Sequence, residues 1–228
     1  MTNAQIRNYI SKLNQNRIDK NLIFLKRISA DVDYVYIWER MPKELEKNEW
    51  NPYKFYFIKN ADKKYVAAVL DMGYRNLHWY VLSKFRKQGF LVNAMQNIIL
   101  EHLFEDREEQ YIIIDPQNNS ENLASQRVAE LLGFKYISDS ERKNEYYLKY
   151  CKKINKPIGI HHKIGEPRIN EMMNITRSLA VRLKMLRSEL LQAYGENEYA
   201  EEMQWLSEEL FKSARSLIEE SWYKFEKE

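Results

Sequence analysis

Phe85-Arg-Lys-Gln-Gly-Phe-Leu-Val92 is a basic turn with one glycine, between an aromatic-rich segment and an apolar, helix-patterned one. The preceding segment, Leu77-His-Trp-Tyr-Val-Leu82, predicts a strand, because aromatic and β-branched side chains favour sheets. The following segment, from about Gly89 to Phe104, predicts a helix. The first turn of a helix has N–H groups without intrahelical acceptors, and the helix dipole adds partial positive charge there. The turn therefore predicts a site for a phosphate or diphosphate group.

The side chains of the turn favour the same kind of ligand. Arg86 and Lys87 carry full positive charges, and Gly89 lacks a Cβ, so that backbone and ligand can approach closely. The pattern differs from two common nucleotide loops: G-x-G-x-x-G needs three glycines, and G-x-x-x-x-G-K-[ST] appears nowhere. From the turn alone, a solvated basic loop stays the alternative.

Two motifs in the chain resemble the GNAT superfamily of N-acetyltransferases. Arg86-Lys-Gln-Gly-Phe-Leu91 resembles its R/Q-x-x-G-x-G/A motif, except that Leu91 stands where the family usually has Gly or Ala. Asn122-Leu-Ala-Ser-Gln-Arg-Val-Ala-Glu-Leu-Leu-Gly-Phe134 resembles the N-x-x-S-x-x-V-x-x-x-x-G-F element of the subgroup that includes the ribosomal-protein N-acetyltransferases. The motifs stand in the family's order, and the resemblance covers about residues 77–150.

The resemblance implies that acetyl-CoA is the acyl donor and that no metal is needed. In the family this cofactor lies in a V-shaped gap between two strands, which correspond here to 77–84 and 110–115. The resemblance assigns cofactor contacts to backbone groups near Val81 and Leu82, to the turn residues Arg86, Lys87, Gln88, Gly89, Phe90 and Leu91, and to Asn122 and Ser125.

The chain differs from the family at the position of the general acid. Transfer of an acetyl group from a thioester to an amine needs a neutral amine, a donor for the oxyanion and a proton for the leaving thiolate. Many family members supply that proton from a tyrosine four residues before the Gly-Phe pair, and Ala129 occupies this place. Ser125 is then the candidate acid, directly or through a water. The alternative is a serine bonded to its own helix backbone.

The general base is also open. Members of the subgroup often carry Glu where this chain has Asn76. His78 is the candidate base, because the pKa of a histidine suits proton transfer near neutrality. A histidine packed on an aromatic strand is the alternative, and Asp71 and Tyr80 are further candidates.

Hydrophobic periodicity predicts strands and helices over residues 1–150. Their order resembles that of the GNAT superfamily, and the resemblance implies an α+β domain with a mixed, mostly antiparallel sheet flanked by helices. Residues 31–40 are interpreted as a helix, with Ser29 or Asp31 as N-cap and Pro42 after its end. The strand at 110–115 is expected to be buried on both faces. The other predicted elements are helices at 3–16, 89–104 and about 120–132, and strands at 21–28, 54–59, 65–74, 77–84, 134–138 and 145–150.

The composition changes after residue 150. Residues 151–168 read as a basic linker with Pro157, Gly159, Gly165 and Pro167. Residues 169–228 carry two apolar stripes at helical spacing, at 169–194 and 197–225, with Gly195 between them. They predict an antiparallel helical hairpin. We expect the hairpin to form a homodimer, and a lid on the same chain is the alternative.

Bulk properties limit the partners. A net charge of +3 does not favour nucleic acid, although contact through the basic arm at 149–168 is a minority hypothesis. No run of 18 apolar residues indicates a membrane span, and the first residues lack a secretory pattern. Cys151 is the only cysteine, which fits a reducing cytoplasm, and His161-His162 lacks the spaced partners of a zinc site.

The sequence thus predicts an acetyl-CoA-dependent N-acetyltransferase that acts on a primary amine of a protein N-terminus, a lysine or a small molecule. Leu91, Ala129 and Asn76 each replace a residue that the family expects. The alternative is therefore a catalytically weak acyl-CoA-binding module that recruits a protein partner through the C-terminal helices.

Overall fold

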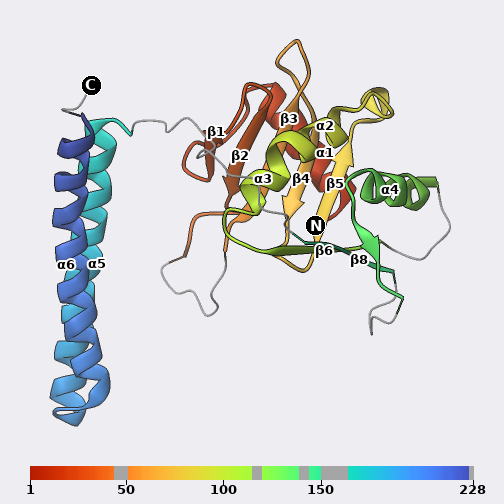
Figure 1. Cartoon of the computed structure of the whole chain (residues 1–228). Helices are drawn as coiled ribbons and strands as arrows, with labels where there is room; N and C mark the ends of the chain where they lie inside the picture. The colour runs from red at the N-terminus through yellow and green to blue at the C-terminus, as the bar shows by residue number, and fades with distance from the viewer. Residues whose placement is uncertain (44–50, 115–119, 139–143, 150–163, 226–228) are drawn as a thin grey trace. The chain divides into compact units, whose positions relative to one another are not determined.

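A computed structural model describes residues 1–43, 51–114, 120–138, 144–149 and 164–225 (Figure 1). The chain divides into two compact units, Met1–His162 and Lys163–Glu228, which are described separately. The predicted α+β class, with a mostly antiparallel sheet and a C-terminal helical hairpin, is confirmed. The predicted boundary at residue 150 and most of the predicted linker lie outside the described residues.

The first unit contains two antiparallel sheets, one of five strands in the order β1-β2-β3-β4-β5 and one of three in the order β6-β8-β7. Its elements are α1 (Asn3–Asn14), β1 (Ile23–Arg27), β2 (Val32–Ile37), β3 (Tyr53–Lys59), β4 (Tyr65–Asp71), β5 (Leu77–Val81), the 3-10 turn η1 (Ser83–Phe85), α2 (Phe90–Ala94), a π-helical turn (Met95–Ile99), α3 (Leu100–Leu103), β6 (Glu109–Ile113), α4 (Ser120–Leu131), β7 (Lys135–Tyr136) and β8 (Glu145–Lys149).

The helix predicted at 31–40 is wrong, because this segment forms β2. Val32-Asp-Tyr-Val-Tyr-Ile37 is rich in β-branched and aromatic residues, which suit a strand, and it pairs antiparallel with both β1 and β3. The hydroxyl of Ser29 does accept the N–H of Val32, at 3.0 Å, but this bond closes the β1–β2 turn instead of capping a helix.

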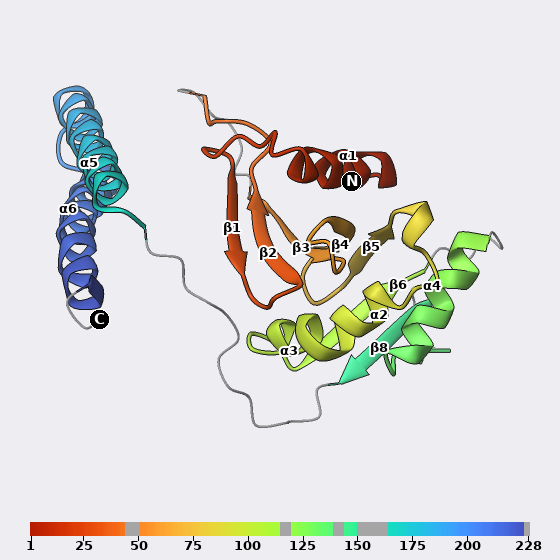
Figure 2. The same cartoon turned by 90° about the horizontal axis from the view of Figure 1, so that it is seen from above.

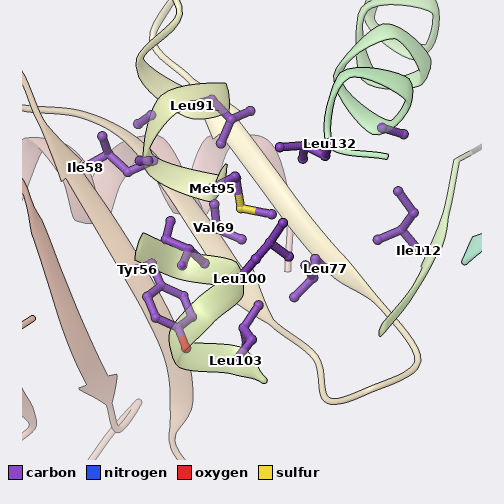
Figure 3. Close-up of a cluster of buried hydrophobic side chains, with 14 of the residues drawn as sticks. Tyr56, Ile58, Val69, Leu77, Leu91, Met95, Leu100, Leu103, Ile112 and Leu132 are labelled. Carbon is purple, nitrogen blue, oxygen red and sulfur yellow. The ribbon is translucent and has the colours of Figure 1, made fainter. Parts of the chain in front are cut away.

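Helices cover both faces of the larger sheet (Figure 2). On one face α1 packs Ile6 and Ile10 against Phe55 and Phe57 of β3. On the other face the continuous helical run from α2 to α3 forms a second core with β3, β4 and β5 (Figure 3). This second core includes Tyr56, Ile58, Val69, Leu77, Leu91, Met95, Ile99 and Leu103.

The strand β6 is buried on one face only, so the expectation of two buried faces is wrong. Gln110 and Ile112 are buried, whereas Ile113 is 38% exposed. The apolar run Ile112-Ile-Ile114 resembles a central strand of a parallel sheet, but β6 pairs antiparallel with β8. Its alternating burial is the pattern of a sheet with one covered face.

A group of buried polar side chains joins the two sheets, and we call it the clasp. Arg107 makes two bonds to the carboxylate of Asp71 at the end of β4, at 3.1 and 2.8 Å. Arg107 also donates to Gln110 Oε1 at 2.7 Å, and Gln110 Nε2 donates to the carbonyls of Gly73 and Tyr74. The clasp therefore fixes the β4–β5 turn to the start of β6.

The second unit is an antiparallel pair of long helices, α5 (Glu166–Tyr194) and α6 (Glu198–Phe225). The helix α5 begins three residues earlier than predicted, because Pro167 is tolerated in the first turn, where its missing N–H would have no acceptor. Gly195 ends α5 with φ +70°. Asn197 then accepts the N–H of Ala200 in the first turn of α6, at 3.0 Å. Every helix in the described part of the chain is too short or too polar to cross a membrane.

The buried pair in the clasp is expected to be essential for stability. The Asp71 side chain is 3% exposed and that of Arg107 is 17% exposed. Asp71→Asn leaves a buried guanidinium without its counter-charge, so the free energy of unfolding should fall by about 3–5 kcal/mol. Asp31→Asn, which breaks the exposed pair with Lys63, is the control and should cost at most about 1 kcal/mol. Urea denaturation measures both, and equal losses would contradict this role of the clasp.

Candidate functional site

The strands β5 and β6 meet at one end only. The N–H of Tyr111 donates to the carbonyl of Tyr74 at 2.7 Å, and that of Ile113 donates to Asn76 Oδ1 at 3.1 Å. Both bonds join β6 to the segment just before β5. Past Asn76 the two strands belong to different sheets, and among the described residues no strand pairs with the outer edge of β5. The two strands are thus joined at one end and unpaired with each other beyond it, as the expected gap between segments 77–84 and 110–115 requires.

The backbone of β5 shows which groups face that open edge. The N–H of Leu82 donates to the carbonyl of Val66 at 3.0 Å, toward β4. Backbone groups alternate in an antiparallel ladder, so those of Trp79 and Val81 point the other way, to the open edge. Of the two predicted backbone contacts, Val81 is therefore placed at the edge. Leu82 is not, because its N–H bonds to β4 and its carbonyl accepts from Phe85.

The turn after β5 presents a row of unbonded N–H groups. Gly89 has φ +81° and precedes α2 without a side-chain cap. Among the described residues, no acceptor bonds the backbone N–H groups of Gln88, Gly89, Phe90 and Leu91. Arg86 and Lys87 are exposed beside them. Arg86 Nε donates to the carbonyl of Val81 at 3.3 Å, which ties the turn to the edge of β5.

Two departures from the family pattern point into the protein. Leu91 is 6% exposed and packs in the core under α2 (Figure 3), so its side chain does not fill the space outside the turn. Ala129 is fully buried in the same core. Asn76, where the subgroup often has Glu, is used to bond Ile113.

Ser125 on α4 reaches across to β5. Trp79 Nε1 donates to Ser125 Oγ at 3.3 Å. Because an indole can only donate, the serine oxygen accepts, and its own hydrogen has no acceptor among the described residues. Asn122 lies on the same helix, three residues earlier. The sequence reasoning gave no role to Trp79, although a period of two from Leu77 already places it on the face of β5 that packs toward α2 and α4.

His78 lies on the opposite face of β5, so the structure does not bring it together with Ser125. His78 Nε2 is 2.8 Å from Asn3 Oδ1 in α1. Burial, followed by the positive N-terminus, lowers the pKa of His78, so the imidazole is neutral at neutral pH. Tyr80 packs on the same α1 side of the sheet. Asp71 is occupied by Arg107 in the clasp, so neither it nor Tyr80 stands beside Ser125 as a base.

Two further features lie away from this edge. A hollow of about 260 Å³ beside η1 is lined by residues of α1, the β3–β4 turn and η1, and none of its lining residues comes from α4. Its Asn14 side chain is occupied, because it bonds both the N–H and the carbonyl of Tyr65. Within the described ranges, no three His, Cys, Asp or Glu side chains are grouped to hold a metal ion.

No protein-family model, curated protein or solved structure matches the chain.

The conformation of Gly89 predicts a cost for any side chain there. A Cβ at this position would lie 3.4 Å from Asn93 Nδ2, and the left-handed φ disfavours every L-residue. Gly89→Ala should lower the free energy of unfolding by about 1–2 kcal/mol. Gly73→Ala, at the same φ of +81° but with no atom within 4 Å of its Cβ, should cost a similar amount. Chemical denaturation measures both, and an unchanged midpoint for Gly89→Ala would show that the turn is not held in this conformation.

Proposed function

We propose that this protein is an acetyl-CoA-dependent N-acetyltransferase that acetylates a primary amine. The observation that carries the proposal is the row of N–H groups at Gln88–Leu91, which have no acceptor in the described part of the chain and directly follow the open edge of β5. Such groups at the start of a helix favour an anion, and Arg86 and Lys87 add positive charge. A diphosphate linked to an extended arm fits a turn that continues from an open strand edge.

In this proposal the diphosphate of CoA binds the turn, and the pantetheine arm lies along β5. The N–H of Val81 points to that edge and donates to an amide carbonyl of the arm, while the Val81 carbonyl, which already accepts from Arg86, has a second lone pair for an amide N–H of the arm. Ser125 and Trp79 then lie on the side of β5 where the thioester would arrive. The acceptor is a protein N-terminus, a lysine or a small amine.

The reaction needs one proton to move from the amine to the leaving thiolate. The neutral amine attacks the thioester carbon, a C–N bond forms, and the C–S bond then breaks. The hydroxyl of Ser125 donates its hydrogen to the thiolate and recovers one from the amine through water, so that protons balance. Trp79 fixes the serine oxygen as an acceptor, which leaves the serine hydrogen for the sulfur. His78 has no part in this scheme, because its ring faces α1.

One observation favours a second function, an acyl-CoA-binding module without turnover. Among the described residues, the side chains weighed as a base are turned away from Ser125 or occupied. His78 and Tyr80 face the α1 side, Asp71 pairs with Arg107, and Asn76 bonds Ile113. Without a base, the module would bind the cofactor and present it or the C-terminal helices to a protein partner.

Calorimetry and an amine panel test the proposal. CoA should bind the full chain with micromolar affinity, and pantetheine, which lacks the diphosphate, should bind at least tenfold more weakly. Radiolabelled acetyl-CoA should then label at least one peptide or small amine. Ser125→Ala should lower kcat about 100-fold with unchanged CoA affinity, because an acid is lost and the turn is untouched. His78→Gln is the control and should keep kcat within about threefold.

The outcomes separate the two functions. Cofactor binding without acetylation of any amine would reject the enzyme and support the binding module. Equal affinities for CoA and pantetheine would reject the diphosphate site in both. Loss of kcat in His78→Gln, with Ser125→Ala active, would overturn the assignment of Ser125.

A further inference from the structure

The helical hairpin buries small side chains between its helices and leaves large ones outside. Ala180, Ala200, Ser207 and Ala214 are fully buried in the seam, and Ser207 Oγ donates to the carbonyl of Ala180 at 3.0 Å. In contrast, several large apolar residues are 38–73% exposed: Ile175, Leu179, Leu186, Tyr199 and Leu206. A two-helix unit that exposes this much apolar surface is incomplete, because such patches mark interfaces.

These five residues lie on one side of the hairpin, whereas Val181, Met185 and Trp205 are exposed away from it. Leu179 directly precedes the seam residue Ala180, and Leu186 follows it on the same stripe seven residues later. On α6, Tyr199 and Leu206 directly precede the seam residues Ala200 and Ser207. Positions that precede the seam by one residue occupy the same flank of each helix, and in an antiparallel pair these flanks meet on one side. We call this side the flank face.

The flank face is more acidic along α6 than along α5. Along α5 the stripe Ile175, Leu179, Arg182, Leu186, Glu189 contains one base and one acid, and along α6 the stripe Tyr199, Glu202, Leu206, Glu209 contains two acids. The whole helices share this difference. The helix α5 has five bases and three acids, a net charge of +2, and α6 has three bases and seven acids, a net charge of −4.

We propose that a second copy of the chain covers the flank face and forms an antiparallel four-helix bundle in which α5 of each copy packs on α6 of the other. A twofold axis can join two such faces in two ways. An axis parallel to the helices places α5 against the partner's α6, and an axis across the helices places α5 against α5 and α6 against α6. The charges decide for the first way, because the second opposes two basic helices and two acidic ones.

The interface does not depend on the proposed acetyltransferase function, and an inactive chain would still form it.

The mass of the full chain in solution is the first test. Light scattering after gel filtration should give twice the chain mass of 27.6 kDa at micromolar concentration. Leu186→Glu should shift the mass to that of one chain, with unchanged helical circular dichroism. Met185→Glu is the matched control: Met185 is 66% exposed, lies further from the seam and should leave the dimer intact. The proposal would be overturned if the wild-type chain were a monomer, or if both variants dissociated to the same extent. Either result would mean that something other than a second copy, another protein or the chain itself, covers the flank face.

Spin-label distances test the pairing within the dimer. A label at Gln192→Cys, in a chain with Cys151→Ser, lies near the turn end of α5. If α5 packs on the partner's α6, both labels share one end of the bundle and are about 20 Å apart, the width of a bundle plus the label arms. If α5 packs on α5, the labels lie near opposite ends, roughly 36 Å apart along the axis at 1.5 Å per residue. The longer distance would reject the pairing of α5 with α6.

Discussion

The buried ion pair between Asp71 and Arg107 is the constraint on which the first unit depends. Each charge is satisfied more than once: Asp71 also accepts the N–H of Gly73 at 2.8 Å, and Arg107 also bonds Gln110. Burying two charges costs several kcal/mol in desolvation, so good geometry and additional bonds are needed to offset it. The clasp supplies them at the point where the chain leaves β4 and the second sheet begins.

The clasp explains why β5 has an open edge. It joins the two sheets before β5 starts, through Gln110, and Asn76 adds a bond to Ile113 beside it. Among the described residues, no ladder joins the following part of β5 to β6. The backbone of Val81, the unbonded N–H groups of the following turn and the pair Trp79–Ser125 all lie along or beside this edge. The proposed acyl-CoA site therefore depends on two features: the clasp fixes the segment before β5, and the edge of β5 beyond it stays open.

Local patterns predicted those parts of the fold that depend on neighbouring residues. Runs of aromatic and β-branched residues on either side of the polar loop at 60–64 gave β3 and β4 with their turn, and the 3–4 spacing of apolar residues gave α5 and α6. The helix predicted at 31–40 was wrong because it relied on Ser29, Asp31 and Pro42, which are residue types that often begin and end helices. The segment between them, Val32–Ile37, has the composition of a strand. The face of His78 was predictable in principle, since Leu77 and Trp79 flank it and point the other way.

Long-range contacts were beyond the reach of such patterns. Nothing local connects Asp71 with Arg107, which is 36 residues away, or Trp79 with Ser125, which is 46 residues away. Ser125 and His78 were chosen for catalysis by residue type and motif. Neither criterion shows that His78 points to the face of β5 opposite Ser125. The small residues in the seam of the hairpin were likewise visible only once the partner helix was in place.

The backbone amide spectrum of the ¹⁵N-labelled protein, recorded with and without CoA, tests the central claim most directly. The account predicts that the amide resonances of Gln88, Gly89, Phe90 and Leu91 move downfield as the diphosphate accepts their hydrogens, while that of Gly73 in the β4–β5 turn stays in place. Saturation with CoA that leaves these four resonances unmoved, or an absence of any binding, would contradict the account.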